Sequence, residues 1–508
     1  MRARVLLVAS EAIPLVKTGG LADVITALTA ALREKNIDAG ILMPGYPSAL
    51  ERATSLAKVS ELDQLPGGPA CLYQGYMPGK DIPVLLLDTE SFRARPDNPY
   101  VDAAGNEYAD NASSFAALAH AAVRICAGRT PLAPPHIVHA NDWHAGLIPL
   151  LLHTNRIKQV GSALTIHNLA FQGNYPIELG PSLGIPDELL NADGIEFWGK
   201  LNFMKAGIQY ADRISIVSES YAKEVLTPQF GNGLDGALNH RRQAIVAIPN
   251  GVDVKVWNPA KDPLIVRNFS RRTIRNKNFC KQDLLKIFKL TKDPFAPLLA
   301  LGSRITHQKM ADVALAALPE ILEKHSRLQV AVLGCGDHGF ENGFMELARR
   351  YPDRLGVHIG YDERLAHALH AGADMLLHGT RFEPFGLTPI YSMLYGTIPI
   401  ASRVGGLIDT IVDAGTGSVP CKGANGILFD GEQPADMIAA VDRAFRIFGN
   451  ADDWLMMQRN AMGGNFSWNE PARKYVQMYT ELAPASMKGL FADAVPSGSG
   501  EIEDVAVA

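Results

Sequence analysis

Short apolar segments alternate with longer amphipathic segments along most of the chain. The apolar segments have the length of buried strands, and the amphipathic ones have helical spacing. A first set of strands is expected at residues 5–9, 40–43, 84–87, 137–139, 163–166, 214–217 and 245–248. The helices expected between them include residues 21–34, 113–127, 201–210 and 219–226. This order predicts an α/β fold in which helices cover both faces of a parallel sheet.

A second set begins after a polar, proline-containing stretch that ends at Pro297. Its strands are expected at residues 298–302, 329–334, 357–359, 375–377, 398–401 and 427–429. Its helices are expected at residues 312–324, 343–350, 363–371, 389–395 and 435–448. We therefore expect two Rossmann-like, doubly wound domains that meet near residue 255. Ligands of such sheets bind beyond the carboxyl ends of the strands, so chemistry is sought in the loops there.

Composition narrows the classes of function. The 508 residues carry 48 Lys and Arg against 53 Asp and Glu, a net charge of −5, so neither nucleic acid nor an anionic membrane is expected as partner. The five cysteines form no C-x-x-C pair, which favours a reducing compartment over a disulfide framework or a cysteine zinc site. Glu11 interrupts the apolar start, and no apolar run of about 18 residues occurs. The prediction is a cytoplasmic protein with neither signal peptide nor membrane span.

Two loops carry cations beside a predicted helix start. Lys17 precedes Gly19 and Gly20, where backbone N–H groups and the helix dipole favour an anion, although an ordinary glycine turn fits the spacing equally well. Arg304 and Lys309 stand between a strand and a helix in the second half. Their guanidinium and ammonium groups can converge on a diphosphate.

A third loop combines a carboxylate with a helix start. Pro389 suits the first turn of a helix, so the backbone N–H groups of residues 386–388 are expected to be free. Glu383 stands just ahead of that turn and can accept hydrogen bonds from hydroxyl groups. Each of these signals is weak alone, and their occurrence together is what favours a phosphate and sugar ligand.

The segment His139-Ala-Asn-Asp-Trp-His144 raises the question of a metal site. Ligation is disfavoured because His139 is expected to close a strand and His144 to open the next helix, which separates their rings. Recognition of a hydroxyl-rich ligand by Asp142 and Trp143, with His167 and Asn168 from the next strand's end, fits better.

Three other segments have simple explanations. The G-x-G-x-x-G spacing at residues 334–339 lacks an acid at the distance that a ribose contact needs, so nicotinamide binding is not expected. The basic run at residues 267–281 is interpreted as a solvated face or linker helix. The small, polar segment from residue 485 onward is expected to be disordered.

Several motifs together resemble the bacterial glycogen synthase and plant starch synthase family. They are Lys-Thr-Gly-Gly-Leu-Ala-Asp-Val at 17–24, Asp-Trp-His-Ala-Gly-Leu at 142–147, and the segments 165–173, 250–259, 381–388 and 405–407. The resemblance is colinear from about residue 3 to residue 482. It implies a GT-B glycosyltransferase with an interdomain cleft and a C-terminal helix that crosses back to the first domain. The implied divisions are residues 1–255, 256–462, 463–484 for that helix, and a tail at 485–508.

The resemblance also implies an activity. A member of this family transfers glucose from ADP-glucose to the non-reducing 4-hydroxyl of an α-1,4-glucan, with retention at the anomeric carbon and without a metal or other cofactor. Glycogen is then the polymer that is elongated. A UDP-glucose-dependent enzyme, a GT-B enzyme with another acceptor, and a non-catalytic glucan-binding relative remain as alternatives.

By motif position the resemblance assigns roles to individual residues. Catalytic roles are implied for Glu383, Asp142, His167, Lys309 and Arg304. Donor contacts are implied for Lys17, Gly19, Gly20, Arg304, Lys309, Tyr361 (on the nucleobase), Glu383, Gly386, Leu387 and Thr388. Sugar or acceptor contacts are implied for Glu11, Asp23, Asp142, Trp143, His167, Asn168 and Asn250.

The chain departs from the family pattern at five positions. Asn141 replaces a histidine, Phe385 replaces a cysteine, Gly379 and Thr380 stand in place of Pro-Ser, and Met310 stands where glycine is frequent. None of these changes removes a charged group, so activity is expected.

Overall fold

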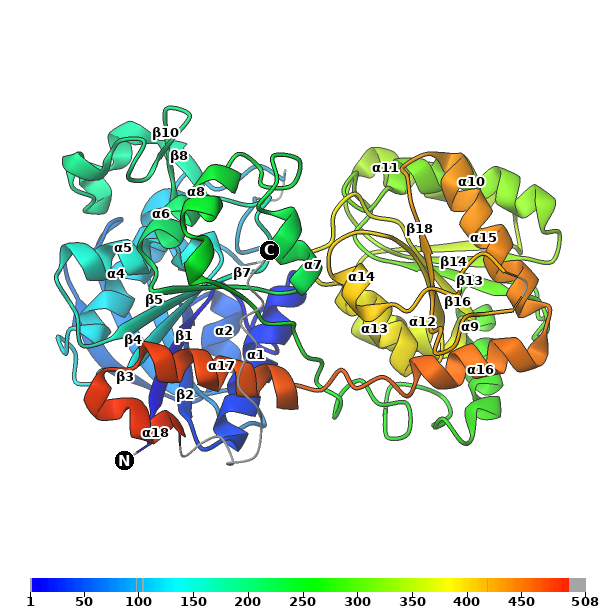
Figure 1. Cartoon of the computed structure of the whole chain (residues 1–508), viewed down its shortest axis with the longest axis horizontal. Helices are drawn as coiled ribbons and strands as arrows, with labels where there is room; N and C mark the ends of the chain where they lie inside the picture. Colours follow the sequence, from blue (N-terminus) through cyan, green and yellow to red (C-terminus); the bar gives the residue numbers. More distant parts are fainter. Residues whose placement is uncertain (1, 97, 103–104, 418, 493–508) are drawn as a thin grey trace. The chain divides into compact units, whose positions relative to one another are not determined.

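The chain forms two compact units in the computed structural model, which describes residues 2–96, 98–102, 105–417 and 419–492 (Figure 1). Unit 1 comprises the chain up to Gly251 together with the segment that begins at Ser467, and unit 2 comprises Val252–Phe466. The C-terminal helix therefore belongs to the first unit, as the resemblance predicted.

Unit 1 is built on a nine-stranded sheet in the order β12-β11-β7-β6-β1-β2-β5-β4-β3. The parallel strands are β1 (Arg4–Val8), β2 (Asp38–Pro44), β5 (Pro83–Asp88), β6 (Ile137–Asn141), β7 (Gly161–Ile166), β11 (Arg213–Ile216) and β12 (Ile245–Ala247). All seven were expected. The antiparallel strands β3 (Thr54–Leu62) and β4 (Ala70–Tyr76) were not, because β3 is largely exposed and has no apolar run.

Helices and a small second sheet complete unit 1. The longer helices are α1 (Gly20–Glu34), α4 (Asn111–Cys126), α5 (Leu147–Thr154) and α6 (Phe203–Tyr210). The shorter ones are α2 (Pro47–Arg52), α3 (Glu90–Arg93), α7 (Glu219–Glu224) and α8 (Asp235–His240). The second sheet has the order β8 (Asn174–Pro176), β10 (Lys200–Asn202), β9 (Glu196–Phe197). Because residues 200–202 pair in this sheet, α6 begins two residues later than expected, with the Asn202 side chain capping it at the Lys205 amide.

The C-terminal helix α17 (Asn469–Leu482) packs on α1 and β7. Its Tyr479 hydroxyl lies 2.8 Å from His139 Nδ1 of β6, and both groups are buried. The chain then continues as α18 (Lys488–Ala492), whose Phe491 is fully buried. The expectation of disorder from residue 485 is therefore wrong up to residue 492, because one buried aromatic side chain holds this segment, and the remainder lies outside the described residues.

Unit 2 contains a fully parallel six-stranded sheet in the order β15-β14-β13-β16-β17-β18. The strands are β13 (Leu298–Gly302), β14 (Gln329–Gly334), β15 (Leu355–Ile359), β16 (Met375–His378), β17 (Ile398–Ser402) and β18 (Ile427–Phe429). The helices are α9 (Lys277–Ile287), α10 (Ala311–Lys324), α11 (His338–Arg350), α12 (Glu363–Gly372), α13 (Leu387–Leu394), α14 (Gly406–Thr410), α15 (Pro434–Phe448) and α16 (Ala451–Ala461). All six strands were expected. No helix among the described residues of either unit is long and apolar enough to cross a membrane.

The basic run at residues 267–281 is not simply a solvated face. Lys277 and Lys281 are buried at the start of α9. The Lys277 ammonium donates to the carbonyl oxygens of His370 and Ala371 and to the Thr397 hydroxyl, and burial lowers its pKa to about 7. These two lysines fasten α9 to the unit, which charge patterning alone could not indicate.

A buried acid–base pair anchors the entry to unit 2. Asp262 Oδ2 accepts a hydrogen bond from His367 Nδ1 at 2.7 Å and another from the Tyr395 hydroxyl at 2.5 Å. Trp257 stacks on the His367 ring at a centroid distance of 4.0 Å. Burial opposes both charges, but the hydrogen bonds outweigh it, so the pKa of Asp262 is lowered and the pKa of His367 is raised.

These pKa shifts predict a pH-dependent contribution to stability. The Asp262 part is present above the ordinary carboxyl pKa near 4, and the His367 part is lost as the pH rises through its raised pKa. We expect Asp262→Asn to lower the free energy of unfolding by about 3 kcal/mol at pH 6, because it removes the nearer carboxylate of a buried imidazolium and leaves it Glu363 at 3.6 Å from Nε2.

Urea unfolding at pH 6 and pH 9 tests this, and the loss should be smaller at the higher pH, because His367 loses its charge as the pH rises through its raised pKa. Glu323→Gln serves as control, since Glu323 forms an exposed pair with Arg350 at 3.3 Å. An equal loss at both pH values would contradict the assignment.

Candidate active site

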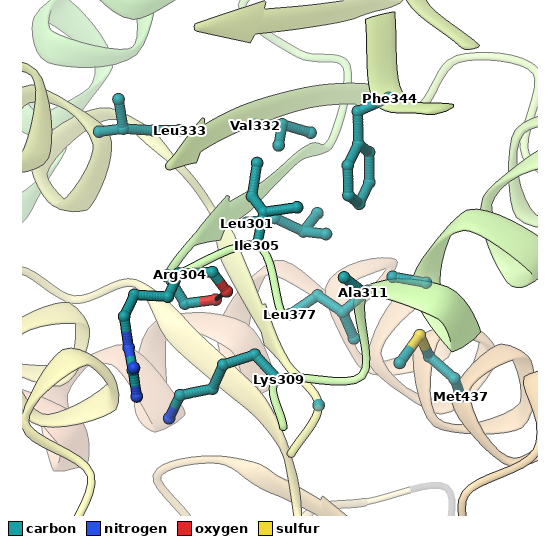
Figure 2. Close-up of a pocket in the computed structure, with 13 residues that line it drawn as sticks. Leu301, Arg304, Ile305, Lys309, Ala311, Val332, Leu333, Phe344, Leu377 and Met437 are labelled. Atoms are coloured by element: carbon teal, nitrogen blue, oxygen red, sulfur yellow. Dashed lines mark hydrogen bonds between the residues drawn. The ribbon is translucent and has the colours of Figure 1, made fainter. Parts of the chain in front are cut away.

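Arg304 and Lys309 lie on the loop that joins β13 to α10. Figure 2 shows their side chains extending to the same side, away from the apolar residues Leu301, Val332 and Phe344 that also line the pocket. The structure thus brings together, at the carboxyl end of a parallel strand, the two cations that the sequence singled out.

The glycine-rich segment at residues 334–339 supports this loop. A Cβ atom at Gly334 would lie 2.0 Å from the Ser303 carbonyl oxygen, and one at Gly336 would lie 2.3 Å from the Ile305 carbonyl oxygen. Glycine is therefore required because two neighbouring loops pack backbone to backbone. The first two glycines of the G-x-G-x-x-G spacing therefore have a structural cause here.

Glu383 is held by two nitrogen donors. Its Oε2 accepts a hydrogen bond from His378 Nε2 at 2.8 Å and forms an ion pair with the Lys309 ammonium. Burial acts to raise the pKa of Glu383, but the Lys309 charge and the His378 hydrogen bond outweigh it and hold the pKa at about 2. Burial lowers the pKa of His378, so its ring is neutral and donates. Oε1 of Glu383 receives no hydrogen bond from the residues that the structure describes.

Sequence reasoning missed His378. It is the last residue of β16 and lies five positions before Glu383, so a histidine closing the strand ahead of the glutamate loop was the available signal. Its ring fixes the orientation of the Glu383 carboxylate.

The Arg304 loop and the Glu383 loop are joined to each other. The Thr380 hydroxyl and the Arg381 amide both donate to the Gln308 carbonyl oxygen, at 3.2 and 2.9 Å. The Arg381 guanidinium binds both carboxylate oxygens of Asp312, at 3.0 and 2.9 Å. Arg381 therefore has a structural role, and its bidentate geometry sets the spacing between the two loops.

Helix α13 begins directly after the Glu383 loop. Gly386 precedes its first residue with a φ of 94°, and a Cβ atom there would lie 2.6 Å from the Leu407 side chain. Only glycine satisfies both conditions. The amides of Leu387 and Thr388 lie in the first turn, where N–H groups lack intrahelical partners.

The structure shows the surroundings of three residues of unit 2 that depart from the family pattern. Phe385 and Thr380 are buried. Met310 is also buried and has a φ of 51°, in the left-handed region. That backbone conformation explains why glycine would be favoured at this position.

Tyr361 is the exposed aromatic residue of the predicted donor set. Its side chain is 62% exposed, directly after Gly360, whose φ is 130°. An accessible ring at the end of β15 is suited to stacking on a nucleobase.

The first loop of unit 1 is closed by Glu11. Its carboxylate accepts hydrogen bonds from the Thr18 hydroxyl at 3.0 Å, the Gly19 amide at 3.3 Å and the Tyr100 hydroxyl at 3.1 Å. Burial raises the pKa of Glu11 although these hydrogen bonds oppose the rise. Glu11 thus orders the loop and accepts the Gly19 amide, and the predicted contact of this amide with the donor stays a prediction.

The main chain at Gly19 is nevertheless accessible. A Cβ atom on Gly19 would meet nothing within 4 Å, and its φ of −150° needs no glycine. Close approach of a ligand is therefore a physical reason for glycine at this position. Lys17, whose ammonium lies 3.1 Å from Asp23, supplies the cation of this loop.

Asp142 orients the loop that carries His167 and Asn168. Its Oδ1 accepts the amide hydrogens of those residues at 2.7 and 3.3 Å. His167 Nε2 lies 3.0 Å from Oδ1 of Asn141, one of the residues that depart from the family pattern. Burial raises the pKa of Asp142 to about 7 and lowers that of His167 to about 3.

Trp143 and His144, which follow Asp142 in the chain, are both buried. Trp143 is 7% exposed and lies in an aromatic cluster with Phe115 and Tyr175, so most of its ring packs within unit 1, and its sugar contact stays a prediction. His139 is engaged with the C-terminal helix. Among the described residues no group of three His, Cys, Asp or Glu side chains could hold a metal ion.

Asn250 lies at the end of unit 1. It is 7% exposed, and its Oδ1 has no hydrogen-bond partner among the residues that the structure describes. A buried carbonyl oxygen without a donor costs free energy unless a ligand or water supplies one. This supports the sugar contact that the sequence suggested for Asn250.

Comparison with known proteins identifies the family. Residues 4–240 match the starch synthase catalytic domain, and residues 285–449 match the glycosyl transferases group 1 domain. The glycogen synthase of Ralstonia nicotianae is 50% identical over 484 residues, covering 95% of this chain and 89% of that protein. The chain belongs to the glycogen synthase family. The glycogen synthase of Bordetella petrii is 49% identical, over 95% of this chain and 93% of that protein.

Solved structures agree. The catalytic domain of starch synthase IV from Arabidopsis thaliana, bound to ADP and acarbose, matches with a TM-score of 0.86 and 26% identity, covering 94% of this chain and 99% of that chain. Sucrose-phosphate synthase from Thermosynechococcus elongatus matches with a TM-score of 0.60 and 17% identity, covering 95% and 99%, and shares the fold. The predicted family and the GT-B fold are confirmed, and the chain is a glycosyltransferase.

The environment of Asp142 predicts a conflict between activity and stability. Its pKa is raised in the folded state, so the native protein loses stability as the pH rises from about 4 to about 7. Asp142→Asn keeps the Oδ1 acceptor and tolerates the φ of 57°, but carries no charge. We expect it to gain about 2 to 4 kcal/mol at pH 8 and to lose most activity.

Unfolding at pH 5 and pH 8 and turnover rates test this. Asp212→Asn is the matched control, since the Asp212 carboxylate also accepts two hydrogen bonds, from the Ser162 amide and hydroxyl. An Asp142 variant that is less stable at pH 8, or fully active, would contradict the assignment.

Proposed function

We propose that this chain transfers glucose from ADP-glucose to the non-reducing 4-hydroxyl of an α-1,4-glucan, and so elongates glycogen with retention at the anomeric carbon. The observation that carries the proposal is the joined pair of loops in unit 2. There Arg304 and Lys309 supply cations, and Glu383 offers a fixed carboxylate oxygen for sugar hydroxyl groups.

We assign Arg304 and Lys309 to stabilisation of the diphosphate leaving group. Cleavage of the bond between glucose and ADP builds negative charge on a diphosphate oxygen, and preorganised cations stabilise that charge. The first turn of α13 adds N–H groups at Leu387 and Thr388. The Arabidopsis starch synthase IV structure contains ADP, which supports ADP-glucose as the donor. Tyr361 is assigned to its nucleobase.

Glu383 is assigned to recognition of the glucose hydroxyls. With a pKa of about 2 it is ionised at neutral pH, so it does not serve as a general acid. Its Oε2 is occupied by Lys309 and His378, while Oε1 is open to a hydroxyl donor. We therefore favour a same-face reaction in which the departing phosphate helps to deprotonate the acceptor. Mass spectrometry of rapidly quenched turnover should detect no glucosyl ester on Glu383 or Asp142.

The acceptor is assigned to unit 1. His167, Asn168 and Asn250 are the polar groups proposed to contact sugar, with Asp142 holding the first two in place. Lys17 and the main chain at Gly19 are proposed to reach the donor. The scattered cysteines favour the cytoplasm as the site of action.

Elongation assays test the donor and the reaction together. Purified protein incubated with glycogen should release ADP and lengthen chains with ADP-glucose, and should do so far more slowly with UDP-glucose. Elongation with UDP-glucose alone would favour the second donor. Absence of elongation with both would contradict the proposal.

A substitution tests the role of Lys309. Lys309→Ala removes a cation that acts on charge formed during the reaction, so we expect kcat to fall about 10²- to 10³-fold with a smaller change in KM. Lys324→Ala is the control, because Lys324 lies at the far end of α10, is half-exposed and pairs with Asp442 of α15. Equal activities of the two variants would show that the role is misassigned.

A further inference from the structure

We propose that Trp198 is a glucan-binding platform outside the reaction site, which holds the polymer while its end is extended. This rests on the proposed function, since it names a second contact for the same acceptor. Trp198 lies in the turn between β9 and β10 and is 84% exposed, a large apolar surface that folding leaves in water.

The backbone at Trp198 is unfavourable for tryptophan. Its φ is 52° and that of Gly199 is 75°, so both residues of this two-residue hairpin turn are left-handed. Such turns favour Asn followed by Gly, and a bulky side chain there is an outlier. A residue that costs stability and buries little points to a role outside folding.

The surrounding side chains fix the turn. The Gly199 amide donates to the Glu196 carboxylate at 2.6 Å, and the Phe197 ring packs edge-on against Trp198 at a centroid distance of 6.2 Å. A Cβ atom at Gly233 would lie 2.9 Å from the Phe197 ring and 3.5 Å from the indole nitrogen. The indole is thus presented by a braced hairpin and does not hang from a loose loop.

This hairpin is connected to the loop of His167. Buried Gln172 receives a hydrogen bond from Asn202 of β10 at 2.7 Å and donates to the Asn232 carbonyl oxygen at 3.0 Å. Gln172 follows Phe171, which is itself 51% exposed. One buried amide therefore ties the proposed acceptor loop to the Trp198 hairpin, and each of the two segments presents an exposed aromatic ring.

A glucan fits this surface better than a protein partner does. Sugar rings offer apolar C–H faces to an aromatic plane and hydroxyl groups to polar neighbours. The exposed rings are separate, with the charged residues Glu196 and Lys200 beside Trp198 in the hairpin, and they form no continuous apolar patch of the kind that protein interfaces use. A long or branched glucan can reach both a reaction site and a separate ring, whereas a short one cannot.

The decisive variant is Trp198→Asn, because Asn-Gly is the preferred pair for this turn. It removes the ring while improving the hairpin, so a loss of binding cannot be attributed to misfolding. We expect the melting temperature to stay the same or rise, and the affinity for glycogen in an electrophoresis gel to fall about fivefold to tenfold. Trp198→Tyr should retain most of the affinity, and Phe295→Ala, which removes a 79% exposed ring of unit 2, should change nothing.

Kinetics separate this proposal from the proposed function. With Trp198→Asn, KM for glycogen should rise in parallel with the affinity loss, while kcat and KM for maltotetraose should stay unchanged. Unchanged glycogen affinity, or an equal loss on maltotetraose, would overturn the platform while leaving the elongation activity intact. A wild-type protein that binds glycogen through Trp198 but elongates no acceptor would overturn only the proposed function.

Discussion

The contact between Lys309 and Glu383 is the interaction on which the site in unit 2 depends. It joins a loop after β13 to a loop after β16, two strands that lie side by side in the sheet. Because Glu383 is buried and Lys309 is largely shielded from water, the carboxylate requires the ammonium, and His378 supplies the remaining hydrogen bond to the carboxylate. The cation and the carboxylate are thus preorganised before any ligand is present, which is the condition for electrostatic catalysis.

Most of the fold was predictable from the sequence because buried parallel strands are continuous apolar runs. Every strand of the unit 2 sheet was expected for this reason. The hairpin of β3 and β4 was not, since an exposed edge strand has no such run. Lys277 and Lys281 show the opposite failure, because a charge in the sequence does not reveal the buried acceptors that it will meet in the folded chain, here carbonyl oxygens for Lys277 and the Asp374 carboxylate for Lys281.

The charged residues of the site were predictable from the sequence, but their contacts within the protein were less so. Motif resemblance selected the charged groups, and the structure brings Lys309 and Glu383 into contact. What the sequence could not show is which polar groups are already used within the protein. Glu11 and Trp143 serve the loops of unit 1, while His378 and the two close-packed glycines Gly334 and Gly336 hold the groups that were predicted.

Buried charges have opposite effects on stability at two places in this molecule. At Asp262 and His367 each buried charge has a partner, and the pair stabilises the fold. At Asp142 the carboxylate receives two amide hydrogen bonds from the described residues in a buried environment, so its pKa rises to about 7 and its charge costs stability at neutral pH. A cation would have removed that cost, yet no described residue supplies one within ion-pair distance. The uncompensated carboxylate is physically consistent with a group retained for chemistry at the expense of stability.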